Sequence, residues 1–167
     1  MTQSEPRGDA GVAGSGTERR ALWSWCLYDW ANSGFPTVIV TYVFSAYFAK
    51  KVAENEVAGT ELWAYALSLS GLAIALASPL LGAIADQTGR RKPWIGVFTV
   101  LCVVGSAALW WVVPGLRREL FALATVAIAN FAFEMGIVYY NAMLPSLAPP
   151  HLLGRLSGWG WGVGYLG

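Results

Sequence analysis

The stretch LWAYALSLSGLAIALASPLLGAIADQTGRRK, residues 62–92, decides the fold class. Its first part, residues 62–85, carries no charged side chain, and charged side chains then crowd into the remaining positions. A bilayer core about 30 Å thick is crossed by roughly 20 apolar residues in a helix. The stretch therefore predicts a helix that crosses a membrane and ends at a short polar turn.

The rest of the chain repeats this pattern of apolar runs between clusters of charge. Its 167 residues are 56% hydrophobic and only 13% charged, whereas soluble domains average about 25% charged residues. The sequence therefore predicts an all-α polytopic membrane helical bundle with four complete spans plus the start of a fifth. We expect these spans over residues 22–48, 62–85, 94–114, 120–147 and 157–167, the last cut off before it can cross, so that the chain is a fragment.

The charged residues also indicate how the chain lies in the bilayer. Residues 1–20 are rich in Gly, Ser and Ala with mixed charge and no apolar period, which favours a disordered tail before an incomplete bundle over residues 21–167. Placing this tail in the cytoplasm puts most of the Lys and Arg residues on the cytoplasmic side, as the positive-inside rule requires. We therefore expect a cytoplasmic N-terminus and a lipid bilayer as the main partner.

Several classes of site are not supported by the sequence. The basic residues fall in short turns and form no patch, so no nucleic-acid partner is expected. Cys26 and Cys102 lie in apolar runs, and the single His151 has no ligand partners at metal-binding spacing. No metal and no cofactor are therefore predicted.

One acidic residue, Glu134, lies near the middle of the fourth expected span. A charge at the bilayer centre costs roughly 2.5–3.5 kcal/mol on insertion scales, so such a residue usually faces a cavity or a partner. At about 100° per residue, Asn130 and Asn141 fall within about 40° of Glu134 on a helix, with Tyr140 beside them. A carboxyl group away from water favours its protonated form, and we expect Glu134 to exchange protons near neutral pH.

The first expected span carries a second polar face. Asp29, Asn32, Ser33, Pro36 and Thr37 share one broad side of a helix, which Pro36 and the neighbouring glycine weaken. Weakened helices at membrane depth are tolerated where freed backbone groups line a cavity. The candidate substrate or proton-coupling residues are therefore Glu134, Asp29, Asn130, Asn141, Asn32 and Tyr140. The alternative is that these polar groups only hold neighbouring helices together.

The last segment, GRLSGWGWGVGYLG, residues 154–167, is rich in glycine. Small residues at intervals of four let helices approach closely in lipid. We expect helix packing to be the main role of Gly154, Gly158, Gly160, Gly162 and Gly164.

The turn GAIADQTGRRK, residues 82–92, has a second interpretation besides an ordinary cytoplasmic turn. Its spacing resembles the signature loop between the second and third helices of the major facilitator superfamily, although Gln87 stands where Arg is common. The resemblance implies a conformational gate, whose acid and base form a latch that breaks and remakes during transport. The residues that match are Gly82, Asp86, Gly89, Arg90 and Arg91.

Three motifs together are similar to one branch of that superfamily, the vacuole-effluxer-like transporters. They are WCLYDWANSGF in the first span, YYNAMLPSLAP closing the fourth and GRLSGWGWGVGYLG opening the fifth. This resemblance implies the N-terminal part of a major facilitator fold, a missing C-terminal helical half and efflux of small solutes such as amino acids. It also implies residence in a bacterial-type plasma membrane.

The sequence thus favours a secondary active transporter of a small solute, working by alternating access and coupled to protons through its buried acids. The alternative is a non-transporting membrane scaffold whose polar residues only pack helices. A membrane-embedded enzyme is not expected, because the chain has no HExxH, GxSxG or paired His/Asp cluster.

Overall fold

The computed structural model describes residues 16–89, 91–114, 116–147 and 153–164. Every regular element within these ranges is helical, which confirms the predicted all-α fold class. The longer helices are α1 (Gly16–Asn32), α3 (Glu56–Thr88), α4 (Arg91–Ala108), α5 (Leu116–Leu147) and α6 (Leu153–Gly164). Most of the expected tail lies outside the described residues. Its last part, Gly16 to Arg20, already belongs to α1, because Glu and Arg are good helix formers that extend the apolar helix outward.

Three helical segments of the described part of the chain are long and apolar enough to cross a membrane. They correspond to the second, third and fourth expected spans and cover Glu56–Ala85, Arg91–Trp111 and Arg118–Pro145. Along α3, the leucines 69, 72, 76 and 80 recur at helical spacing and are 57–68% exposed. Such an exposed apolar stripe is stable against lipid and unfavourable in water, so the fold is built to span a membrane.

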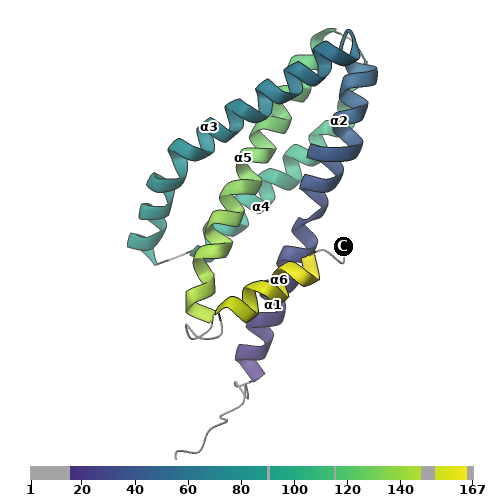
Figure 1. Cartoon of the computed structure of the whole chain (residues 1–167). Helices are drawn as coiled ribbons and strands as arrows, with labels where there is room; N and C mark the ends of the chain where they lie inside the picture. Colours follow the sequence, from purple (N-terminus) through teal and green to yellow (C-terminus); the bar gives the residue numbers. More distant parts are fainter. Residues whose placement is uncertain (1–15, 90, 115, 148–152, 165–167) are drawn as a thin grey trace, which may run out of the picture.

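The first expected span is built from successive short helical segments. After α1 come a π-helical segment, η1 (Phe35–Tyr42), the short helix α2 (Val43–Tyr47) and a second π-helical segment, η2 (Phe48–Val52). Figure 1 shows these segments following one another along a single rod. The change of helix type begins next to Pro36, which has no N–H to donate. The sequence predicted a weakened helix near Gly34 and Pro36. In the structure the helix continues there, but its type changes from α to π.

The turns at the two ends of α3 have clear local causes. Asn55 precedes the helix, and its side-chain oxygen accepts a hydrogen bond from the backbone N–H of Ala58 at 2.9 Å. At the other end, Gly89 has a φ of 62°, in the left-handed region that glycine adopts without strain. The chain can therefore pass from α3 into α4 with almost no loop, as the spacing of the turn predicts.

Helix α5 forms the centre of the bundle and packs most extensively on α4 and α3 (Figure 1). Its inward side consists of small and medium residues spaced by three or four, and Ala122, Val126, Ala129, Ala132 and Met135 are fully buried. Small side chains allow close approach of helices in a membrane. Gly105 on α4 makes such a contact with α5, because a Cβ atom added there would lie 2.9 Å from Ala129 Cβ.

Helix α6 packs mainly against α1 and crosses it in Figure 1. This brings the C-terminal part of the described chain next to its beginning, beside the lower part of α5 as drawn. The contact between α1, α5 and α6 is where the polar residues of the first and fourth expected spans come together.

Candidate functional site

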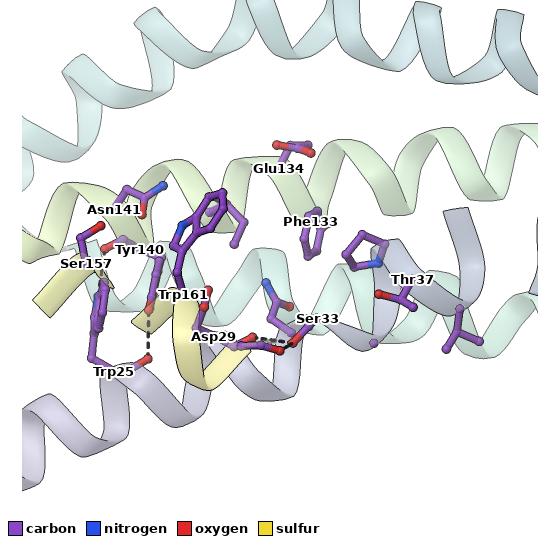
Figure 2. A pocket seen from close by; sticks show the side chains of 16 residues that line it. Trp25, Asp29, Ser33, Thr37, Phe133, Glu134, Tyr140, Asn141, Ser157 and Trp161 are labelled. Carbon is purple, nitrogen blue, oxygen red and sulfur yellow. Dashed lines mark hydrogen bonds between the residues drawn. The ribbon is translucent and has the colours of Figure 1, made fainter. Parts of the chain in front are cut away.

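A cavity of about 690 Å³ lies between α1, η1, α5 and α6 (Figure 2). This is within the usual range of about 300–1,000 Å³ for small-molecule sites. Its walls combine two acidic residues with amide, hydroxyl and aromatic side chains. The lining residues are Trp25, Asp29, Asn32, Ser33, Gly34, Pro36, Thr37, Val38, Phe133, Glu134, Ile137, Tyr140, Asn141, Ser157, Trp161 and Gly164.

Asp29 lines the cavity from α1, where α6 approaches it closely. A Cβ atom added to Gly164 would lie 2.7 Å from Asp29 Oδ2, so glycine at this position lets the backbone of α6 reach the carboxylate. The Ser33 hydroxyl lies 2.7 Å from the carbonyl oxygen of Trp30 and 3.2 Å from that of Gly164, and it can donate to either. The polar face of α1 therefore meets the backbone of α6 at the edge of the cavity.

Glu134 lines the cavity from α5, and Figure 2 shows its carboxylate lying apart from that of Asp29. Within the described residues, neither carboxylate has a hydrogen-bond or ion-pair partner. No group of three or more His, Cys, Asp or Glu in the same ranges is placed to hold a metal ion. The chemistry available here is therefore charge recognition or proton exchange by two separate carboxyl groups.

Trp25 and Tyr140 join α1 to α5 at one wall of the cavity. Their rings stack with centroids 4.4 Å apart and an interplanar angle of 7°. The Tyr140 hydroxyl donates to the carbonyl oxygen of Trp25 at 3.1 Å, and the indole N–H of Trp25 donates to the carbonyl oxygen of Tyr140 at 3.5 Å. Tyr28 stacks on the other side of this pair, and its hydroxyl lies 2.8 Å from Thr99 Oγ1 on α4.

The sequence prediction missed several of these aromatic residues. Trp25 lies near the start of the first expected span, where Trp usually lies at the membrane interface, but it is only 7% exposed and packs on Tyr140. Its position one helical turn before Asp29 was the available signal, because residues four apart share a helix face. Trp161 lines the cavity although its neighbours in sequence predicted mainly helix packing.

The three asparagines expected at the site have different surroundings. Asn32 and Asn141 line the cavity, and the Nδ2 atom of Asn32 is buried with no acceptor within the described residues. Asn130 does not belong to the lining. Its side-chain amide donates to the Ser70 hydroxyl on α3 at 3.1 Å, and that hydroxyl donates to the carbonyl of Ala127 at 3.0 Å. Asn130 therefore lies in the contact between α5 and α3.

The five glycines of the last segment also differ. Gly160 and Gly164 face α1, where an added Cβ atom would lie 2.5 Å from the ring of Trp25 and 2.7 Å from Asp29 Oδ2, respectively. At Gly154, Gly158 and Gly162 an added Cβ atom would meet nothing within 4 Å in the described structure. The contact between α6 and α1 thus uses the pair Gly160 and Gly164.

Of the expected gate residues, Gly82 and Gly89 lie at the end of α3 opposite its Asn55 cap, and Arg91 begins α4. Gly82 has open space where a Cβ atom would be added, and Gly89 ends α3. The guanidinium group of Arg91 donates a hydrogen bond to the carbonyl oxygen of Ala142 on α5. The expected latch between Asp86 and Arg90 lies outside the described residues, because Arg90 and the side chain of Asp86 are not among them.

Comparison with known proteins identifies the family to which the chain is similar. The family model of the Major Facilitator Superfamily matches residues 7–167. A protein of Bacillus subtilis (strain 168) called "Uncharacterized MFS-type transporter YxiO" is 33% identical over 147 residues, which cover 86% of this chain. The match covers 34% of that relative, so the chain spans about a third of the relative's length. No solved structure matches the chain.

Proposed function

This chain belongs to the major facilitator superfamily, and on that premise we propose that it contributes one wall of the solute path in a secondary transporter. The transporter works by alternating access and carries a small solute across the membrane. The observation that supports this proposal most directly is the cavity with two carboxyl groups, Asp29 and Glu134, that have no partner among the described residues.

The position of Glu134 is the strongest part of this support. It lies within the membrane-crossing segment Arg118–Pro145, far from both ends. An acidic residue at this depth is costly and usually serves a transport path or a proton relay. Hydrogen-bonded partners would reduce that cost in a purely structural role, and the described residues offer Glu134 none. In the proposed transporter, a solute or a proton is the partner of the Glu134 carboxyl group.

The finer features of the proposal rest on the sequence motifs. We place the chain in the vacuole-effluxer-like branch, with amino acids as the solutes and efflux as the direction. Glu134 and Asp29 recognise the solute or couple its movement to protons, with Asn32, Asn141 and Tyr140 supporting them. The turn at Gly82, Asp86, Gly89, Arg90 and Arg91 acts as the gate, in a bacterial-type plasma membrane with the N-terminus in the cytoplasm. The chain works together with a C-terminal helical half.

A membrane scaffold remains the second candidate, and one observation favours it. Asn130 and Ser70 form a hydrogen-bonded link between α5 and α3, which is the packing role that polar side chains often have in membranes. A scaffold would use Asp29 and Glu134 in the same way. It would therefore lose stability when these residues are neutralised, and it would have no flux to lose.

The proposal is tested by flux through the protein in the length that its host expresses, reconstituted in liposomes. The probe is a mixture of isotope-labelled common amino acids, loaded inside and followed on both sides by mass spectrometry. We expect Asp29→Asn and Glu134→Gln each to lower the rate at least about tenfold, equivalent to about 1.4 kcal/mol of transition-state stabilisation. We also expect Glu134→Gln to remove the dependence of the rate on pH.

Glu54→Gln is the matched control, because Glu54 is exposed and lies outside the cavity. Its flux should equal that of the unmodified protein. If both cavity variants keep their flux while remaining folded, the transport role of these carboxyl groups is wrong. If the unmodified protein moves none of the amino acids, the amino-acid part of the proposal is wrong.

A further inference from the structure

The charged residues in the described lining of the cavity are all acidic. Asp29 and Glu134 are its acidic residues, and its described lining contains no Lys, Arg or His. Among the described residues, the ion pair between Lys50 and Glu56, at 4.0 Å, joins η2 to the start of α3 and lies outside the lining. Among the described lining residues, the cavity therefore offers negative charge with no cation beside it.

The carboxylates are also free to accept hydrogen bonds. Within the described residues, no donor is placed on the side chain of Asp29 or Glu134. Both carboxylates are partly buried, and burial of a carboxylate is costly unless it is paired and hydrogen-bonded. A positively charged ligand supplies the pairing, and any N–H donors on it add hydrogen bonds, whereas an anionic ligand would be repelled.

Aromatic side chains complete the walls. Trp25, Phe133, Tyr140 and Trp161 all line the cavity, and Figure 2 shows the ring of Trp161 between Asn141 and Asp29. Trp161 lies at the rim of the cavity and is 66% exposed. Aromatic faces attract ammonium groups, and Trp does so most strongly. Anionic solutes gain nothing comparable from such rings.

Asn32 adds a requirement for a second group on the ligand. Its Nδ2 atom is buried beside the cavity and has no acceptor within the described residues. Buried donors are normally paired, and a ligand oxygen close to the ammonium group would supply the acceptor. A hydroxyl or a carboxylate oxygen would serve equally well.

From this combination we infer that the cavity binds a small organic ammonium ion that carries an oxygen acceptor near its charge. The carboxylate of Asp29 binds the ammonium group, Trp161 covers it, and the amide of Asn32 donates to the oxygen. The separate carboxylate of Glu134 adds negative charge to the same cavity. This inference rests on the proposed transport function and narrows its solute class to amino alcohols and amino acids bound through their ammonium end.

The test measures binding to the purified protein in the length that its host expresses, by the shift of its thermal unfolding in detergent. The probes are choline, ethanolamine and glycine, each titrated alone. The matched control probe is the neutral carbon isostere of choline, in which carbon replaces the quaternary nitrogen. We expect at least one of the ammonium probes to stabilise the protein, and the neutral isostere to bind at least about tenfold more weakly than choline.

Protein variants then locate the binding. Asp29→Asn and Glu134→Gln should weaken ammonium binding at least about tenfold, whereas Glu54→Gln, which removes one exposed charge elsewhere, should leave it unchanged. Asn32→Ala should weaken choline binding and leave tetramethylammonium, which has no oxygen, unaffected. This last comparison separates the acceptor requirement from a general loss of folding.

Three results would overturn the inference. They are equal binding of choline and its neutral isostere, undiminished ammonium binding in both acid variants, and no stabilisation by any ammonium probe. Flux of only neutral or anionic solutes that still depends on Glu134 would leave the proposed transport function intact and refute the ammonium assignment. The two proposals therefore fail separately.

Discussion

Tyr139 and Tyr140 are neighbours on α5, yet they face two different regions of the molecule. The hydroxyl of Tyr139 donates to the carbonyl of Leu81 on α3 at 2.9 Å, and its ring stacks on Trp94 and Phe98 of α4. Tyr140 makes the same kind of hydrogen bond to α1, but it lines the cavity. We call the first region the scaffold side of α5, packed on α3 and α4, and the second the cavity side, facing α1 and α6.

The difference shows that hydrogen bonding alone does not separate packing from function. Both tyrosines are buried and both bond to a backbone carbonyl. The scaffold side is filled by alanines, Met135 and aromatic rings. The cavity side leaves open space between polar groups, which protein interiors avoid unless something occupies it. Changes on the scaffold side should therefore alter stability, and changes on the cavity side should alter transport.

The largest effect is expected at the closest helix contact of the scaffold side. In Gly105→Leu, the new side chain meets Ala129, whose Cβ atom is 2.9 Å from the position of an added Cβ atom. Overpacking of this kind costs about 1–3 kcal/mol, and more where helices must separate. Gly96→Leu on the same helix is the control, because nothing lies within 4 Å of its added Cβ atom. The free energy of unfolding in mixed micelles measures both, and equal stability of the two variants would contradict the packing.

The next effect is expected on the cavity side, at the contact between α6 and Asp29. Gly164→Ala places a Cβ atom 2.7 Å from Asp29 Oδ2, so the carboxylate or the helix must shift. We expect transport to fall about tenfold, equivalent to about 1.4 kcal/mol. Gly162→Ala on the same helix has open space and should transport normally. The initial rates of uptake compare the two, and equal rates would show that the position of α6 against Asp29 is unimportant.

The smallest effect is expected from removing single hydroxyl groups. Tyr139→Phe and Tyr140→Phe each lose one hydrogen bond to a backbone carbonyl, worth about 0.5–1.5 kcal/mol. Their stabilities should therefore fall by similar amounts, whereas only Tyr140→Phe should change the apparent affinity for the solute. Parallel measurements of unfolding and uptake make the comparison. A change of affinity in Tyr139→Phe as large as in Tyr140→Phe would remove the distinction between the two sides.

The bundle itself could be predicted from the sequence because its cause is local. Runs of apolar residues of the length of a bilayer predict the helices that the structure contains, and Gly89 predicts the turn between α3 and α4. The charge-free pattern also reaches across Gly34 and Pro36, so the change to π-helical segments there was expected only as a weakness. The sequence cannot say how backbone hydrogen bonds rearrange around such a pair.

The site could be predicted only in part. Helical spacing shows which residues share a face of a helix, but it does not show which other helix packs there at each position along its axis. Asn130, Glu134 and Asn141 share one stripe by angle, yet Asn130 meets Ser70 of α3 while the other two line the cavity. The glycine period predicts close approach without showing which face is used. The structure uses Gly160 and Gly164 against α1, and the reason lies in the position of Trp25 and Asp29.

The central claim is that the cavity between α1, α5 and α6 is a water-filled path for the solute. The most direct test is modification of Thr37→Cys, which lines the cavity, in protein whose buried Cys26 and Cys102 are replaced by alanine. Val100→Cys, exposed on the outer face of α4, is the lipid-facing control. If the cavity is such a path, a membrane-impermeant thiol reagent should modify Thr37→Cys much faster than Val100→Cys and block uptake. Equal, slow modification of the two cysteines would contradict it.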